Sequence, residues 1–189
     1  MISPSEWISP TRMVGMTAHL LAAIVCGFAW IQNKPRFYSV RLVASLAMLE
    51  VALFLDAAFN WRWMLHGVLA NSAVANGVYG QRRLPQVLAL LALSAMACSV
   101  LILAGRRLRR RPGAILAVFG GVFSAAFWLV EVVSLHATDI ALQARLGPVM
   151  VVAVVWVLTS AALAAGIYWD VRFGSGIAQA SPRRSPDLR

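Results

Sequence analysis

The sequence predicts an all-α integral membrane bundle of five transmembrane helices, with a short interfacial helix at the outer face. Of the 189 residues, 60% are hydrophobic and 13% are charged, and the mean hydropathy is +0.74. Soluble domains carry about a quarter charged residues, so this surface is too apolar to face water all round. The apolar residues gather in five runs, each near the length of about 20 residues that crosses a bilayer.

The five spans are expected over roughly 13–32, 41–59, 87–105, 114–135 and 148–169, within one domain of residues 1–172. The first run is interpreted as an uncleaved span, because Glu6 opposes a basic leader and no A-x-A cleavage site follows. Ser, Pro and Gly dominate residues 173–189, which are therefore expected to form a disordered cytoplasmic tail.

The longest connection, residues 60–86, is predicted to carry the short helix on the outer membrane surface. Trp61 and Trp63 suit the headgroup region. Apolar residues then recur at helical spacing, at Met64, Leu65, Val68 and Leu69. Gly77 and Gly80 are expected to end this helix, and Pro85 to begin the third span.

The distribution of arginine predicts the orientation. "GRRLRRRPG" (105–113) carries five arginines in one short loop, which the positive-inside rule places in the cytoplasm. Alternating the other loops from there puts twelve of the 17 basic residues inside and the N-terminus outside. We therefore expect a multi-pass protein of a bacterial inner membrane with a cytoplasmic C-terminus. Because the basic residues lie between apolar runs, the net charge of +10 favours a lipid bilayer over nucleic acid as the partner.

Small residues predict where the spans pack closely. They recur every four positions on two spans, which lets helix backbones approach one another. These residues are Ala117, Gly121 and Ala125 on the fourth span, and Ser160 and Ala164 on the fifth. Cys26 and Cys98 lie inside apolar runs and are expected to pack as small apolar side chains rather than form a disulfide.

Two ionisable residues lie inside predicted spans, where an unpaired charge is costly. Glu50 is near the middle of the second span, and His19 on the first differs from it in depth by only about 5 Å. Two arrangements stay open. Glu50 and His19 form a hydrogen-bonded pair, or a neutral Glu50 bonds to a backbone carbonyl or a serine.

The other unusual polar residues all fall on the predicted outer face. In one candidate site His136, oriented by Asp139, exchanges a proton while Asp56 or Glu131 assists. The ligand-binding residues of that site are Asn60, Arg62, His66, Arg82 and Arg83. Helix pinning by the same charges is an alternative, and a bound metal or haem is another. The spacing matches no metal signature, so no metal ligand is assigned and the cofactor stays open. Motifs of serine hydrolases, zincins and P-loops are absent from the sequence.

Three segments carry a family resemblance. "DAAFNWRWMLHG", "GVYGQRR" and "SLHATD" resemble a family of small, multi-span, uncharacterised bacterial inner-membrane proteins. The resemblance covers roughly residues 40–145, and its motif positions are Asp56, Asn60, Arg62, His66, Tyr79, Arg82, Arg83, His136 and Asp139. It implies a membrane location and brings no established activity.

The sequence suggests two functions. The first is an outer-face site that binds or processes an anionic or lipid-linked ligand. The second is a non-catalytic accessory or assembly subunit of a larger membrane complex, which the small size and the small-residue stripes favour. An ion or proton transporter ranks last, because the inner halves of the spans hold almost no polar residues. No reaction is identified, so enzyme activity stays open.

Overall fold

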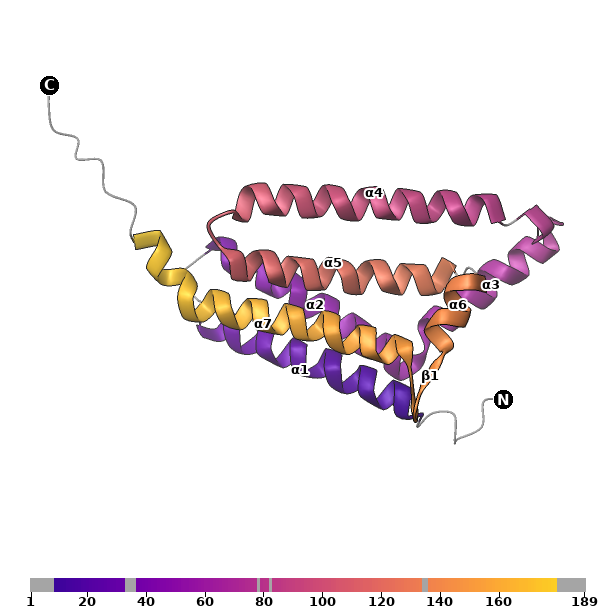
Figure 1. The fold of residues 1–189 in the computed structure, drawn as a ribbon, viewed down its shortest axis with the longest axis horizontal. Coiled ribbons are helices and arrows are strands. Elements are labelled where there is room, and N and C mark those ends of the chain that lie inside the picture. The colour runs from indigo at the N-terminus through magenta and orange to yellow at the C-terminus, as the bar shows by residue number, and fades with distance from the viewer. Residues whose placement is uncertain (1–8, 33–36, 78, 82, 134–135, 180–189) are drawn as a thin grey trace, which may run out of the picture.

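The all-α bundle is confirmed by a computed structural model, which describes residues 9–32, 37–77, 79–81, 83–133 and 136–179. For residues 37–39, 79, 136–139 and 174–179 only the backbone is described. Within these described residues, five helices are long and apolar enough to cross a membrane. They are α1 (Pro10–Gln32), α2 (Phe37–Phe59), α4 (Arg83–Leu108), α5 (Pro112–Val133) and α7 (Val151–Gln179) (Figure 1).

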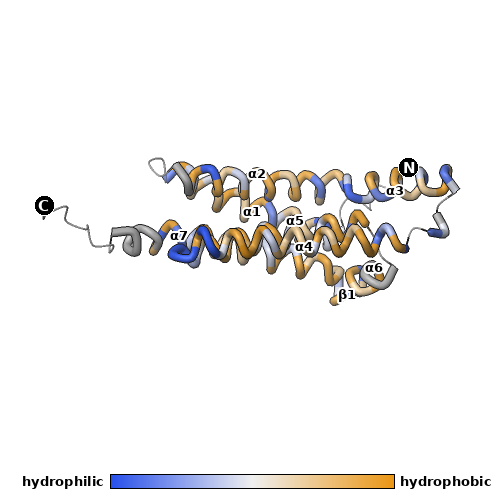
Figure 2. Tube along the Cα trace, turned by 90° about the horizontal axis from the view of Figure 1, so that it is seen from above, coloured by the Kyte–Doolittle hydropathy of each residue, from blue (hydrophilic) through white to orange (hydrophobic). Residues whose placement is uncertain are grey.

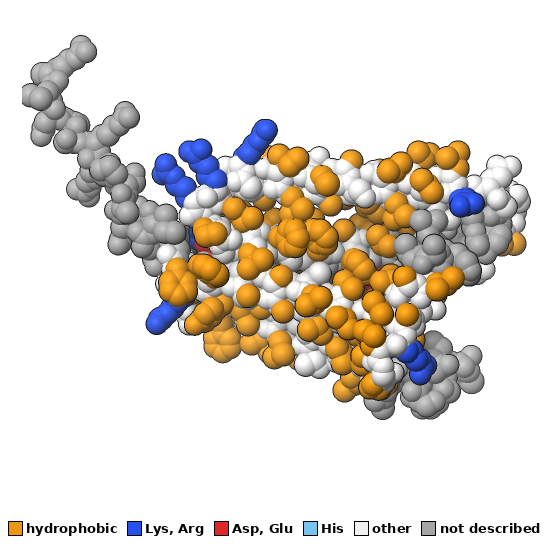
Figure 3. Space-filling model, in the orientation of Figure 1, with side chains coloured by type: hydrophobic (Ala, Val, Ile, Leu, Met, Phe, Trp, Pro, Cys, Tyr) orange, Lys and Arg blue, Asp and Glu red, His pale blue; other side chains and the backbone are white. Residues whose placement is uncertain are grey.

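The shorter elements gather at one end of the bundle, where α1 and α7 begin and α2 and α5 end (Figure 1). These elements are α3 (Trp61–Ala75), the 3-10 turn η2 (Tyr79–Gln81), α6 (His136–Gln143), and the paired strands β1 (Arg145–Leu146) and β2 (Val149–Met150). We call this end the α3 end. The opposite end, which carries Arg106, Arg107 and Arg109–Arg111, is the arginine end. Hydrophobic residues line the long helices between the two ends (Figures 2 and 3).

The core is formed by α1, α2, α5 and α7, whereas α4 packs along α5 at the edge (Figure 1). Gly113, Gly120 and Gly166 let α5 and α7 touch backbone to backbone, since a Cβ at Gly166 would lie 2.3 Å from the Ala117 nitrogen. Of the predicted stripe, Ala117 is fully buried at this contact. Gly121 instead faces α2, against Leu46. At the arginine end, Arg111 and Asp170 form a bidentate ion pair between the start of α5 and α7.

The short surface helix is present as α3, and a single residue makes its corner with α2. Asn60 lies between the two helices in the left-handed conformation, at φ 61° and ψ 38°. Asparagine tolerates this conformation better than most residues do. Gly77, at φ +68°, follows the end of α3 as predicted.

Most helix boundaries differ from the predicted spans by a few residues, and three of these differences have an identifiable physical cause. Helix α4 begins at Arg83 rather than near 87, because Pro85 is tolerated within a first turn. Helix α7 begins at Val151 rather than 148, because Gly147 at φ +63° turns residues 145–150 into a two-stranded hairpin. Helix α7 also continues to Gln179, past the expected end of the fifth span at 169, since extending a formed helix adds one hydrogen bond per residue. The disorder expected for residues 173–189 stays a prediction. The rest of the predicted tail lies outside the described residues.

Candidate functional site

A buried ion cluster of Asp56, Arg62 and Glu131 lies at the α3 end. The Arg62 Nε is 2.8 Å from Asp56 Oδ2, and its Nη1 donates to Glu131 Oε2 at 2.5 Å. The Nε and Oδ2 atoms are in ionic contact without a well-aligned hydrogen bond. The guanidinium also lies 4.4 Å from the ring centre of Trp156 on α7. Four helices therefore meet on one arginine side chain.

The α2–α3 corner explains how the sequence builds this cluster. Asp56 is one turn before Asn60, and its Oδ1 accepts a hydrogen bond from the Arg62 backbone N–H at 2.8 Å. Asp56 thereby satisfies a first-turn N–H of α3 that has no partner within the helix. Asn60 makes no side-chain capping bond. The corner turns Arg62 back over the bundle, where Glu131 of α5 receives it.

A pocket of about 460 Å³ opens beside the cluster. Its polar lining includes Asn60, Arg62 and Glu131, three of the residues predicted to form the site. The remaining lining residues are Ser9, Thr11, Arg12, Ala57, Trp63, Leu142, Gln143, Met150, Val152 and Trp156. Helices α1, α2, α3, α5, α6 and α7 all contribute, so this pocket, which we call the α3-end pocket, exists only in the assembled bundle. Its wall joins charged groups to a large apolar surface.

Two neighbouring side chains close helix ends instead of facing this pocket. The His66 Nδ1 lies 3.3 Å from the Val132 carbonyl, and the Gln86 amide donates to the Val133 carbonyl at 3.0 Å. Both contacts satisfy carbonyls in the last turn of α5. Arg12 does the same for α2, donating to the carbonyls of Ala57, at 3.0 Å, and Ala58. His66 lines a separate cavity of about 250 Å³ with Gln86.

The other predicted site residues are placed less completely. Arg83 is exposed at the start of α4. Arg82 lies outside the described residues. His136 and Asp139 belong to α6, but their side chains are outside the description, so their contact with Arg62 stays a prediction.

A second buried polar group lies deeper in the bundle. The His19 Nδ1 is 2.7 Å from Glu50 Oε2, and the Ser160 hydroxyl donates to the same oxygen at 3.1 Å. Both partners that the sequence left open for Glu50, a histidine and a serine, are thus engaged at once. The spacing of small residues predicts only a packing role for Ser160. The signal that was missed is depth, because Ser160 lies as far along α7 as His19 lies along α1.

The chemistry available at the α3 end follows from these contacts. Arg62 occupies the space between the two carboxylates and contacts both, so its single positive charge is shared between them. Among the described residues, no group of three or more His, Cys, Asp or Glu side chains is arranged to hold a metal ion. The described part of the cluster is therefore built to hold a guanidinium in place and to present polar edges to the pocket.

Comparison with protein-family models, with curated proteins and with solved structures finds no match for this chain.

Proposed function

We propose that this integral membrane protein binds an amphiphilic ligand, an anionic or lipid-linked molecule, in the α3-end pocket. The observation that carries the proposal is the composition of the wall. Arg62, Asn60 and Gln143 supply polar edges beside an apolar surface that includes Trp63 and Trp156. Ligand pockets combine a mainly apolar lining with a few placed polar groups in this way.

We further propose that the membrane is a bacterial inner membrane and that the α3 end faces the periplasm. The five arginines of residues 105–113 support this orientation through the positive-inside rule. The pocket would then accept ligands from the outer leaflet. If the site also processes its ligand, His136 oriented by Asp139 is the group proposed to exchange a proton, and His136→Ala would abolish turnover while the protein still accumulates.

Native mass spectrometry with two short-chain lipids tests the binding proposal. Wild-type protein should retain phosphatidylglycerol over phosphatidylcholine. Only phosphatidylglycerol brings a headgroup of net negative charge to Arg12 and Arg62, which line the pocket. Gln143→Trp places a bulky ring in the pocket from an exposed position and should weaken retention at least about tenfold. Gln81→Trp makes the same change at an exposed position outside the pocket and should retain the lipid. Equal retention by both variants would refute the proposal.

The accessory-subunit function has one observation in its favour. Helix α4 is apolar enough to span the membrane, yet none of the residues in its most apolar stretch is buried within the chain. Helix α4 packs chiefly against α5, so most of its surface is open to another protein. In this case a partner should co-purify in fixed stoichiometry, and Leu91→Arg on the exposed face of α4 should release it while lipid retention is unchanged.

A further inference from the structure

A layer of buried polar side chains crosses the bundle at one depth. His19, Glu50, Ser124 and Ser160 each lie nine residues from the α3 end of their helices, α1, α2, α5 and α7. At 1.5 Å per residue this depth is about 13 Å, close to the middle of a hydrocarbon core about 30 Å thick. All four side chains are buried, and Glu50 is fully so.

The hydrogen bonds of this layer engage only one of the two carboxyl oxygens of Glu50. Its Oε2 atom is held by His19 and Ser160, but Oε1 is buried without a hydrogen-bond partner among the described residues. The Ser124 hydroxyl is likewise buried and unpartnered within the described part. Helices α2 and α5 run in the same direction, with Leu46 against Gly121 and with Asp56 and Glu131 sharing Arg62. That register brings Glu50 and Ser124 to the same level.

The arrangement is unlike that of a serine nucleophile with its base. The same nitrogen of His19, Nδ1, faces both Glu50 and Ser160, at 2.7 and 3.0 Å. A catalytic relay needs the two ring nitrogens to contact different partners. This layer is therefore suited to holding a proton between its side chains, not to attacking a substrate.

Charge balance identifies what the layer holds. A carboxylate at mid-membrane needs one compensating positive charge. Among the described residues, the titratable groups around Glu50 are His19 and Cys26 on α1, while α5 and α7 present Ser124 and Ser160. The charged groups of Asp56, Arg62 and Glu131 lie beyond Trp156 and are paired with one another, so Arg62 does not serve as the partner of Glu50. One proton, bonded to Glu50 or to His19, makes the layer neutral.

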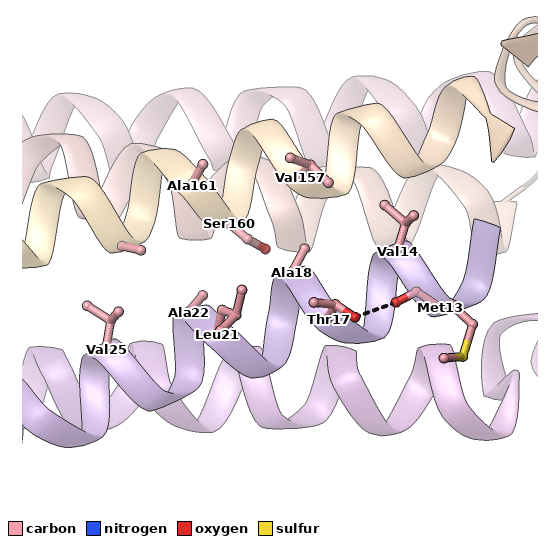
Figure 4. Close-up of a pocket in the computed structure, with 11 residues that line it drawn as sticks. Met13, Val14, Thr17, Ala18, Leu21, Ala22, Val25, Val157, Ser160 and Ala161 are labelled. Atoms are coloured by element: carbon pink, nitrogen blue, oxygen red, sulfur yellow. Dashed lines mark hydrogen bonds between the residues drawn. The ribbon is translucent and has the colours of Figure 1, made fainter. Parts of the chain in front are cut away.

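Trp156 separates this layer from the α3-end pocket. Its ring lines the pocket, packs on Arg62, and has its centre 6.3 Å from that of His19. Gly15 lets the ring lie against α1, since a Cβ there would be 2.3 Å from it. On the arginine side of the layer an apolar cluster closes the bundle, formed by Ala22, Cys26, Leu46, Ala117, Leu163 and Ile167. A groove of about 520 Å³ reaches Ser160 between α1 and α7, and it is lined almost entirely by apolar side chains (Figure 4).

We propose that Glu50, with His19, Ser160 and Ser124 around it, is a buried proton-binding site that is reached from the α3-end pocket past Trp156. A proton taken up on Oε1 makes Glu50 a donor to the Ser124 hydroxyl, and its release returns Oε1 to a carboxylate oxygen. Because apolar residues close the arginine side, the proton leaves by the way it came. The site binds protons without conducting them, and it does so whether or not the pocket binds lipid.

Infrared difference spectra of the full-length protein in lipid nanodiscs, recorded between low and high pH, test the site. We expect a protonated-carboxyl band that is present at low pH, lost at high pH and removed by Glu50→Gln. Ser124→Ala should shift the band, whereas Ser99→Ala, an exposed serine of α4, should leave it in place. Glu50→Asp keeps a carboxyl group and should move the band, which covers failure of Glu50→Gln to fold. A pH-independent band, or difference spectra identical in wild type and Glu50→Gln, would overturn the proposal.

Two further measurements test the ligand and the route. Replacing Na⁺ by choline at fixed pH should leave the band unchanged, and a band that Na⁺ displaces would show that a metal cation is bound instead. After transfer to D₂O, Trp156→Phe should speed the isotope shift of the band at least about tenfold. Trp169→Phe, an exposed tryptophan of the same helix, should leave the rate unchanged. Equal rates in both variants would overturn the route past Trp156.

Discussion

Arg62 is the residue on which the α3 end depends most. It is buried, and its partners come from α2, α5 and α7. Depth along the spans predicted that Asp56, Arg62 and Glu131 would share one end, and the structure brings them into contact. Depth alone did not predict that Arg62 would form ion pairs with both carboxylates, because the direction in which a side chain leaves its helix is set by packing.

Removing the Arg62 charge should destabilise the protein strongly. Arg62→Gln leaves two buried carboxylates without their cation, and breaking a buried ion pair in this way costs about 3–5 kcal/mol. Thermal unfolding of the detergent-purified protein measures the loss. Arg83→Gln, at an exposed arginine, should change stability by less than about 0.5 kcal/mol. Equal melting of the two variants would contradict the importance of the cluster.

Glu50→Gln should leave expression and thermal stability nearly unchanged. If Glu50 is neutral, a glutamine of the same shape keeps an oxygen for the hydrogen bonds from His19 and Ser160. If it is a carboxylate paired with a charged His19, the same change should destabilise by more than about 1.4 kcal/mol, which is one pKa unit of linkage. Thermal melting of the variant decides between the two, and we expect the smaller effect.

The helices are joined mainly at their ends and at one close contact. Side chains of neighbouring elements satisfy the last carbonyls of α2 and α5, through Arg12, His66 and Gln86. Helix pinning is therefore the role that the described contacts give to His66. Helix α5 meets α7 through Gly113, Gly120 and Gly166. On α5, the four-residue spacing of small residues identified only residues next to these glycines, such as Ala117 and Gly121. Gly113, Gly120 and Gly166 were missed because glycine in an apolar run carries no sign of which neighbour approaches it.

Gly166→Ala should weaken the contact between α5 and α7. The new methyl group would lie 2.3 Å from the Ala117 backbone nitrogen, and overpacking of this kind costs about 1–3 kcal/mol. Gly27→Ala is the matched control, because a Cβ there meets nothing within 4 Å. In a helix interior that change should be neutral or stabilising by up to about 1 kcal/mol. Thermal unfolding in one detergent compares the pair, and a Gly166→Ala protein as stable as wild type would contradict the contact.

Across the whole molecule, every buried Asp, Glu, Arg or His among the described side chains lies between mid-bundle and the α3 end. The fold was predictable because apolar runs of bilayer length have few other outcomes. The end of the bundle that holds the candidate site was predictable, because each polar residue has a depth fixed by its distance from a helix end. Which residues line one pocket together was not predictable, because His66 and Glu131 lie near the same end yet face different cavities.

Reporter fusions test the orientation of the whole chain. A reporter active only in the cytoplasm should work after Arg111 or Arg189 and fail after Asn76 or Thr138, because the arginine loop stays inside. Equal expression of the four fusions, measured by immunoblot, is the control. Cytoplasmic activity of the fusion at Asn76 would place the α3 end inside and remove the basis for an outer-leaflet ligand.

The central position of α7 has a consequence for biogenesis. This helix is made after α1, α2, α4 and α5, yet it supplies Ser160 to the pair formed by α1 and α2, and Trp156 to Arg62. During synthesis α1 and α2 therefore remain in the membrane with their polar groups incompletely matched until α7 leaves the insertion machinery. A nascent chain released before α7 should be recognised by membrane quality control and degraded faster than the complete protein, which pulse-chase labelling of a chain ending at Gln143 would measure.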